Sequence, residues 1–277
     1  MAETLSARVR HAERVMGTVV SFDVPASATA DGSLESAIRW LHWVDRVFSP
    51  YRPDSDISRL ARAEVAVGDC APEVGQVLAA CAGLEEESGG YFTSSPGGRL
   101  DPSGYVKGWA AERAASRLTE AGSAAHLVNA GGDVRCVGAG PHAGNWRVGI
   151  AAPPVSGGFT SGQPVSAGGS VSGPPASGGL AFVVAGREFA VATSGTAERG
   201  AHIVDPVAGR PATGLASITV AGPSLTRADA CATAAFAMGP DLAREWTESL
   251  DGYEAFAILP DGATWRTRDF SAYLAGD

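Results

Sequence analysis

The sequence predicts an α+β protein in which mainly antiparallel sheets are flanked by helices. Segments rich in β-branched residues recur along the chain, and several of them come in adjacent pairs. Other segments repeat apolar residues at three- and four-residue steps, which places one apolar stripe along a helix. Strands and helices in this mixed order favour the α+β class.

The N-terminal half is expected to be mostly helical behind one strand. That strand is expected at 16–24, where β-branched residues partly alternate. Helices are then expected at 34–48 with Ser33 as N-cap, in a short segment through Ile57 and Leu60 behind candidate caps at 54–56, at 74–87, and at 107–120. Glycines 89 and 90 can take the left-handed conformation that ends a helix.

The C-terminal half is expected to hold most of the sheet. Strands are expected at 126–134, 146–150, 180–184, 189–193, 217–221 and 255–259. Glycines 131 and 132 interrupt the first of these, which is consistent with a β-bulge or with a close ligand. One alanine-rich helix is expected at 228–238, where Gly239-Pro240 stops it.

A segment at 155–179 contains almost only Gly, Ser, Pro, Ala and Thr and no charged residue. It cannot bury enough apolar surface to offset the entropy of ordering, so we expect a flexible surface insertion.

Composition narrows the classes of partner. The 277 residues are 45% hydrophobic, enough for one large domain or two small ones with a sizeable core. A net charge of −9 without a Lys/Arg run argues against nucleic acid and anionic membranes, which leaves small molecules and proteins. No stretch approaches the roughly 20 apolar residues of a membrane span, and the first residues lack a signal-peptide core, so we expect a cytoplasmic protein.

The four cysteines do not form a recognisable site. Cys70, Cys81, Cys136 and Cys231 are far apart in sequence, with neither zinc-site spacing nor the density of a disulfide-stapled domain. We expect buried free thiols.

Asp229 and Thr233 are the first candidate ligands of a metal ion. They lie four residues apart on an expected helix, so their oxygens share one face of the helix surface and can hold a small cation. Magnesium suits so sparse a set, because it completes its octahedron with water and phosphate oxygens. An aspartate near a helix start is, however, more often a cap.

Three further segments combine a polar residue with exposed backbone. Ser194-Gly195-Thr196 follows a strand and could hold a phosphate, although a simple turn is the more common explanation of such a motif. Lys107-Gly108 begins an expected helix, where a cation and free amides favour an anion, or where the lysine is simply exposed. His202 lies beside a turn and could act as a base, or could be a structural histidine.

Taken in order, these segments resemble the ApbE family of FAD:protein FMN transferases. The resemblance covers nearly the whole chain outside the insertion, which makes it far more specific than any one motif. The blocks are MGT at 16–18, FSPYRPDSDISRL at 48–60, GGYF at 89–92, DPSGYVKGWAAER at 101–113, NAGGD at 129–133, WRVGIAAP at 146–153, ATSGTAERG at 192–200, HIVDPVAGRP at 202–211 and ADACATAAFAMG at 228–239.

The resemblance implies a single ApbE-like, T-fold-like domain over residues 1–277 with a cleft for FAD, and it assigns roles to residues. Asp229 and Thr233 correspond to the magnesium ligands, joined by the backbone carbonyl of Val106. His202 corresponds to the proposed catalytic base, and Lys107 would neutralise the pyrophosphate. The residues that would line the FAD cleft are Met16, Tyr51, Lys107, Glu112, Gly132, Ser194 and Gly195. The family commonly has Asp at the position of Glu112 and Ala at that of Val106.

The implied reaction is magnesium-dependent transfer of FMN from FAD to a threonine or serine of a flavoprotein, with release of AMP. If water replaces the acceptor hydroxyl, the same site becomes an FAD pyrophosphatase, and a binder that holds FAD without turnover would use the same cleft. Many relatives are exported lipoproteins, whereas the expected cytoplasmic location implies a cytoplasmic acceptor. A protein-interaction module built on the insertion is a third interpretation.

Overall fold

An eight-stranded, wholly antiparallel sheet forms the centre of the computed structural model, which describes residues 7–153, 179–196 and 203–275. Its strand order is β1-β2-β3-β4-β7-β10-β11-β12, and two smaller antiparallel pairs, β5-β6 and β8-β9, lie beside it. The predicted α+β class with mainly antiparallel sheet is therefore confirmed. Apart from Gly179, the expected insertion at 155–179 lies outside the described residues.

The elements alternate in short runs along the chain. The strands are β1 (Arg8–Val15), β2 (Thr18–Pro25), β3 (His126–Ala130), β4 (Asp133–Val137), β5 (Trp146–Ala151), β6 (Leu180–Gly186), β7 (Phe189–Gly195), β8 (Val204–Asp205), β9 (Arg210–Pro211), β10 (Ser217–Gly222), β11 (Glu254–Ile258) and β12 (Thr264–Arg266). The helices are α1 (Ser27–Ala30), α2 (Ser33–Phe48), α3 (Asp56–Ala61), α4 (Pro72–Glu87), α5 (Ser103–Glu120), α6 (Leu225–Met238) and α7 (Pro240–Glu248), with short 3-10 turns η1 (Val67–Asp69), η2 (Pro96–Gly98) and η3 (Phe270–Tyr273).

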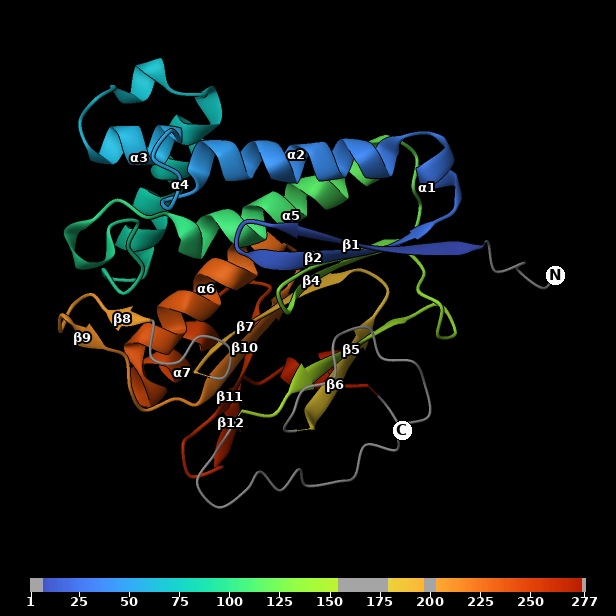
Figure 1. Ribbon diagram of the computed structural model, residues 1–277. Coiled ribbons are helices and arrows are strands. Elements are labelled where there is room, and N and C mark those ends of the chain that lie inside the picture. The colour runs from blue at the N-terminus through green and yellow to red at the C-terminus, as the bar shows by residue number, and fades with distance from the viewer. Residues whose placement is uncertain (1–6, 154–178, 197–202, 276–277) are drawn as a thin grey trace.

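The sheet separates two hydrophobic cores. Helices α2, α5 and α6 lie on one face and β5 and β6 on the other, as Figure 1 shows, and η3 packs with β5 and β6. Successive side chains of a strand point to opposite faces, so along β7 Ala190 and Ala192 enter the helix-side core while Phe189 and Val191 enter the second core. Among the helices of the described ranges, none combines the length and apolar character needed to cross a membrane.

The first expected strand, at 16–24, is confirmed from residue 18 onward as β2, but the prediction for residues 16 and 17 was wrong. Residues 16 and 17 form the two-residue turn of a β1-β2 hairpin, in which Val15 pairs with Thr18. Met16 and Gly17 have φ values of 54° and 69°, as a type I′ hairpin turn requires at its two central residues. Strand β1 escaped prediction because it lies at the sheet edge, where its half-exposed positions carry Arg, His and Glu.

A second turn of this kind lies beside the first. Gly131 and Gly132 have φ values of 61° and 102° and join β3 to β4, so the expected strand at 126–134 is a hairpin and contains no bulge. Asn129 Oδ1 accepts the Gly132 N–H at 2.8 Å, and the Gly131 N–H donates to the Val19 carbonyl at 3.1 Å. The glycines therefore serve a tight turn packed against the β1-β2 hairpin.

Helix boundaries differ from the expectations where local capping decides them. Gly32, with φ of 76°, is the N-cap of α2, and Ser33 is its first helical residue, so the predicted cap at Ser33 was wrong. The Asp31 carboxylate accepts the Ser33 N–H at 2.8 Å, and the Ser33 hydroxyl donates to the Ala28 carbonyl at 3.1 Å. Ser55 does cap α3, accepting from the Ser58 N–H at 3.1 Å.

The helices of the functional region begin earlier than their periodicity indicated. α5 starts at Ser103, so Lys107 is its fifth residue and does not begin it. α6 starts at Leu225. Gly239-Pro240 ends α6, as expected, but the proline also begins α7, because proline fits the first turn of a helix. The four cysteines are free, and Cys70 is half-buried while the other three are buried.

His126 on β3 gives the fold a testable acid sensitivity. Burial is the main cause that lowers the pKa of this imidazole to about 4, and its Nδ1 lies 3.1 Å from the Ser123 hydroxyl. In the unfolded chain His126 becomes protonated below about pH 6.5, whereas in the native state it stays neutral down to about pH 4. Native stability should therefore fall as pH drops through this window, by about 3 kcal/mol in full.

We expect His126→Gln to flatten the dependence of the unfolding free energy on pH between 6.5 and 4, measured by urea denaturation at several pH values. The same comparison at pH 8, where residue 126 of the wild type is neutral in both the folded and the unfolded chain, gives the cost of the substitution itself and serves as the control. Equal slopes in wild type and His126→Gln would contradict the assignment.

Candidate functional site

Helices α5 and α6 approach closely through two glycines of α5. A Cβ added to Gly108 would lie 2.7 Å from the Asp229 Cβ and 2.7 Å from the Leu225 carbonyl oxygen, closer than real Cβ atoms come. One turn earlier, a Cβ on Gly104 would lie 3.5 Å from the Thr233 Cγ2. The Gly104/Gly108 face of α5 thus brings the two predicted metal ligands of α6 against the first turns of α5.

Asp229 is buried in this interface, with 3% of its surface exposed. The expectation that it lies on a helix surface was therefore wrong, and it is not a cap of its own helix. Its Oδ2 accepts the Gly108 N–H at 2.8 Å, and its Oδ1 lies 3.4 Å from the Lys107 Nζ. Burial raises the pKa of Asp229, the positive charge of Lys107 opposes that rise, and the nearby Asp133 carboxylate adds to it.

Asp133, the first residue of β4, is a site residue that sequence reasoning missed. It is 2% exposed, its Oδ2 lies 2.5 Å from the Lys107 Nζ, and its Oδ1 accepts the Thr193 N–H at 3.0 Å. The signal was present in the NAGGD block, where an acidic residue begins a strand that is otherwise buried. Within that block the glycines are consistent with a β-bulge or a close ligand, and the motif assigns no separate role to the carboxylate.

The charges of this cluster favour a further cation. In the described part of the chain, the ion pairs of Asp133 and Asp229 both go to Lys107, so two buried carboxylates share one ammonium group. A buried negative charge is stable only when it is paired, and a divalent cation would supply the missing charge. Across the described ranges no group of three or more His, Cys, Asp or Glu could hold a metal, so other oxygens would have to complete the coordination.

Thr233 is half-buried on α6, one turn from Asp229, which agrees with the spacing argument. Val106, 6% exposed, is the fourth residue of α5 and packs in the helix-side core. The Val106 carbonyl thus belongs to the residue directly before Lys107 on α5.

Four other predicted residues lie on turns or strand ends of the central sheet. Met16 and Gly132 belong to the two adjacent hairpin turns, and Met16 also packs against the helix-side core. Ser194 and Gly195 end β7, where they pair with Ile218 and Ser217 of β10, and so belong to the strand rather than to a turn after it. Ser194 is buried.

Of two further predicted residues, one is exposed and the other lies outside the described part of the chain. Tyr51 lies in the loop after α2 with 87% of its surface exposed. His202 lies outside the described residues. Its role stays a prediction.

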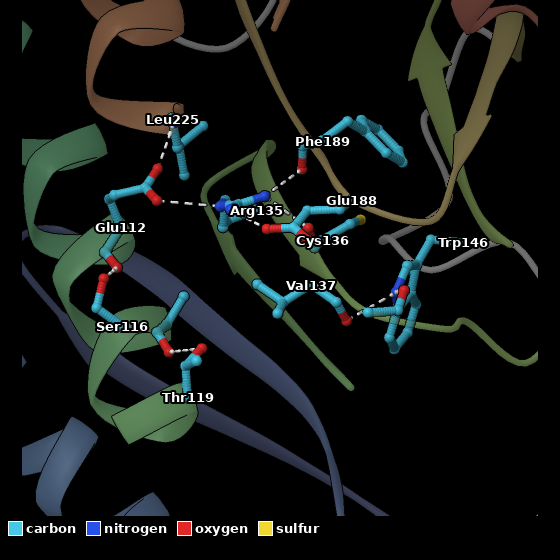
Figure 2. Close-up of polar contacts among 12 residues, drawn as sticks. Glu112, Ser116, Thr119, Arg135, Cys136, Val137, Trp146, Glu188, Phe189 and Leu225 are labelled. Carbon is cyan, nitrogen blue, oxygen red and sulfur yellow. Dashed lines mark hydrogen bonds and ion pairs between the residues drawn. The ribbon is translucent and has the colours of Figure 1, made fainter. Parts of the chain in front are cut away.

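Glu112 is held by protein groups on both carboxylate oxygens (Figure 2). Oε1 accepts from the Arg135 Nε at 3.0 Å, and Oε2 accepts from the Leu225 N–H at 2.5 Å. Its predicted position in an FAD cleft is not tested by these contacts.

Two surface hollows among the described residues lie elsewhere. The larger, about 700 Å³, is bordered by α4, α5, the start of α6 and Tyr253, and the smaller, about 510 Å³, by α7 and β12. None of the predicted site residues lines either hollow, so the FAD cleft stays a prediction.

The comparison with known protein families supports the resemblance suggested by the order of the sequence motifs. The ApbE family model matches residues 16–98 and 93–257, which is most of the chain. The chain belongs to the ApbE family. The Lys107, Asp133 and Asp229 cluster lies within the matched residues.

Curated ApbE relatives are similar over part of their length. A protein from Treponema pallidum (strain Nichols) named FAD:protein FMN transferase is 31% identical over 182 residues, covering 60% of this chain and 45% of that protein. A protein of the same name from Escherichia coli (strain K12) is 26% identical, covering 64% and 48%. The aligned region thus spans about half the length of these relatives.

Solved ApbE structures share the fold along almost the whole chain. The flavin transferase ApbE from Vibrio cholerae superposes with a TM-score of 0.79 at 19% identity, covering 97% of this chain and all of that one. The ApbE protein from Thermotoga maritima gives 0.80 at 21% identity, covering 98% and 100%.

The α5-α6 contact yields a prediction for this ApbE chain. Gly108→Ala should push the Asp229 carboxylate away from α5, because the new methyl group meets the Asp229 Cβ and the Leu225 carbonyl. Overpacking of this kind costs about 1–3 kcal/mol, measurable as a loss of unfolding free energy in urea. The control Gly83→Ala on α4 has nothing within 4 Å of its added Cβ and should be neutral or mildly stabilising. Equal stability of both variants would show that the helices can separate without cost.

Proposed function

We propose that this protein is a magnesium-dependent FAD:protein FMN transferase. It would cleave FAD, join FMN through a phosphoester bond to a threonine or serine of a flavoprotein, and release AMP. Membership of the ApbE family and the name of the curated relatives support this proposal. The observation that carries it is the buried cluster in which Lys107 lies between Asp133 and Asp229.

The residues present fit a magnesium ion. Asp229 and Thr233 would hold it from α6, together with the Val106 carbonyl from α5, and the excess of carboxylate over ammonium favours a divalent cation. When bound, the metal would stabilise the negative charge that develops on the pyrophosphate oxygens.

Lys107 would act as a fixed positive charge. Two carboxylates orient its ammonium group, which is 30% exposed and so can still meet a substrate phosphate. Positioned cations of this kind contribute mainly by stabilising charge in the transition state of phosphoryl transfer.

The covalent step would break the phosphoanhydride bond of FAD and form a phosphoester bond to the acceptor. The acceptor hydroxyl oxygen attacks the FMN phosphorus, the bond between this phosphorus and the bridging oxygen breaks, and AMP leaves with that oxygen. His202 would accept the hydroxyl proton. The residues that would contact FAD are Met16, Tyr51, Gly132, Ser194 and Gly195. We expect the reaction to take place in the cytoplasm.

Replacing Asp229 tests the metal assignment. Asp229→Asn keeps the size of the side chain but removes its charge, so magnesium-dependent AMP release should fall by at least about 100-fold. AMP is measured by liquid chromatography, and circular dichroism checks folding. Asp241→Asn, at an exposed position in the first turn of α7, is the control and should retain activity. AMP release by Asp229→Asn at the wild-type rate would exclude the assignment.

The whole proposal is tested by incubating the protein with FAD, magnesium and candidate flavoproteins from the same cell. Flavin fluorescence that stays with the acceptor on a denaturing gel, together with AMP release, would support transfer. AMP and FMN without a labelled acceptor would indicate an FAD pyrophosphatase. FAD binding without AMP would indicate a non-catalytic binder.

A further inference from the structure

Three contacts between α5 and α6 are spaced by one helical turn. Residues four apart on a helix lie on one face, and here this holds for both helices at once. The pairs run in opposite chain directions: Gly104 against Thr233, Gly108 against Asp229, and Glu112 against the amide of Leu225. The two glycines permit close approach, and the Glu112 contact ties the first residue of α6 to one place along α5.

Glu112 acts as the missing N-terminal cap of α6. Leu225 is the first helical residue, so its N–H has no acceptor within the helix, and the Ser224 side chain forms no capping hydrogen bond. The Glu112 carboxylate accepts this N–H at 2.5 Å and places a negative charge at the positive end of the helix dipole.

The sheet in turn fixes Glu112 through Arg135 of β4 (Figure 2). The Arg135 side chain is only 10% exposed and donates to the Cys136 carbonyl at 2.7 Å and the Phe189 carbonyl at 3.3 Å. It also pairs with Glu188 at 3.0 Å. A guanidinium held at several points gives the Glu112 carboxylate little freedom.

We propose that Glu112 is a positioning residue that sets the axial place of α6 and thereby of Asp229 and Thr233. Magnesium binds at 2.0–2.1 Å with little tolerance, so a slide of α6 by about 1 Å would weaken coordination. This inference rests on the proposed function for the identity of the metal. It differs from the role implied by the family resemblance, in which Glu112 touches FAD.

The test compares Glu112→Ala and Glu112→Gln with Glu188→Gln, which alters the other carboxylate partner of Arg135. Mn²⁺ binding to the protein without FAD is measured by electron paramagnetic resonance. The half-saturating magnesium concentration, the KM for FAD and kcat are taken from AMP release. Hydrogen exchange reports on the amides of the first turn of α6.

For Glu112→Ala we expect about tenfold weaker Mn²⁺ binding and a magnesium requirement raised about tenfold, because a charged hydrogen bond is lost. The first-turn amides of α6 should exchange faster, while the KM for FAD and kcat at saturating magnesium stay within about twofold. Glu112→Gln keeps an acceptor oxygen for Leu225 and should show a smaller change in the same direction, and Glu188→Gln should match wild type.

A raised KM for FAD with unchanged Mn²⁺ affinity in the Glu112 variants would overturn the proposal and place Glu112 at the substrate. Unchanged values throughout, or an equal loss in Glu188→Gln, would also overturn it. Metal binding and exchange need no turnover. If they behave as expected while the wild type releases no AMP, the proposed function fails and the positioning role stands.

Discussion

The contact between Gly108 and Asp229 is the constraint on which the candidate site depends. Without a side chain at Gly108, α6 can pack so closely on α5 that the Asp229 carboxylate receives a backbone N–H from the neighbouring helix. That packing buries the carboxylate and brings it to the ammonium group of Lys107, which comes one residue before the glycine. Any larger residue at 108 would separate the groups that make up the site.

The sheet supplies the second half of this arrangement. Asp133 follows directly on the Gly131-Gly132 turn, and the Thr193 amide fixes one of its oxygens while Lys107 meets the other. The buried carboxylates of Asp133, from the sheet, and Asp229, from α6, therefore share the single ammonium group of Lys107. This leaves a net negative charge in a buried part of the protein. Such a site is suited to bind a divalent cation together with phosphate groups, which is the chemistry that the proposed flavin transfer requires.

The layer of β5, β6 and η3 supports the site from a distance. It covers the face of the sheet opposite the helices and gives that face a core of its own, which includes Trp146, Phe189 and Phe270. With both faces covered, the strands that carry Asp133, Ser194 and Gly195 are buried in most positions. The same fold in ApbE structures at 19–21% identity indicates that these layers tolerate wide changes of sequence.

The sequence by itself determined the fold class, most helices and strands, the family and the placement of Asp229 and Thr233 one turn apart on a helix, because these depend on spacing over a few residues. It could not distinguish the turns at 16–17 and 131–132 from strand or bulge, since both depend on which strands pair. Only the tertiary structure decided that Asp229 is buried, that Asp133 joins Lys107, and that Glu112 holds the start of α6. These facts rest on contacts between residues far apart in the chain, such as Gly108 and Asp229, separated by 121 positions. Local periodicity carries no information about such contacts.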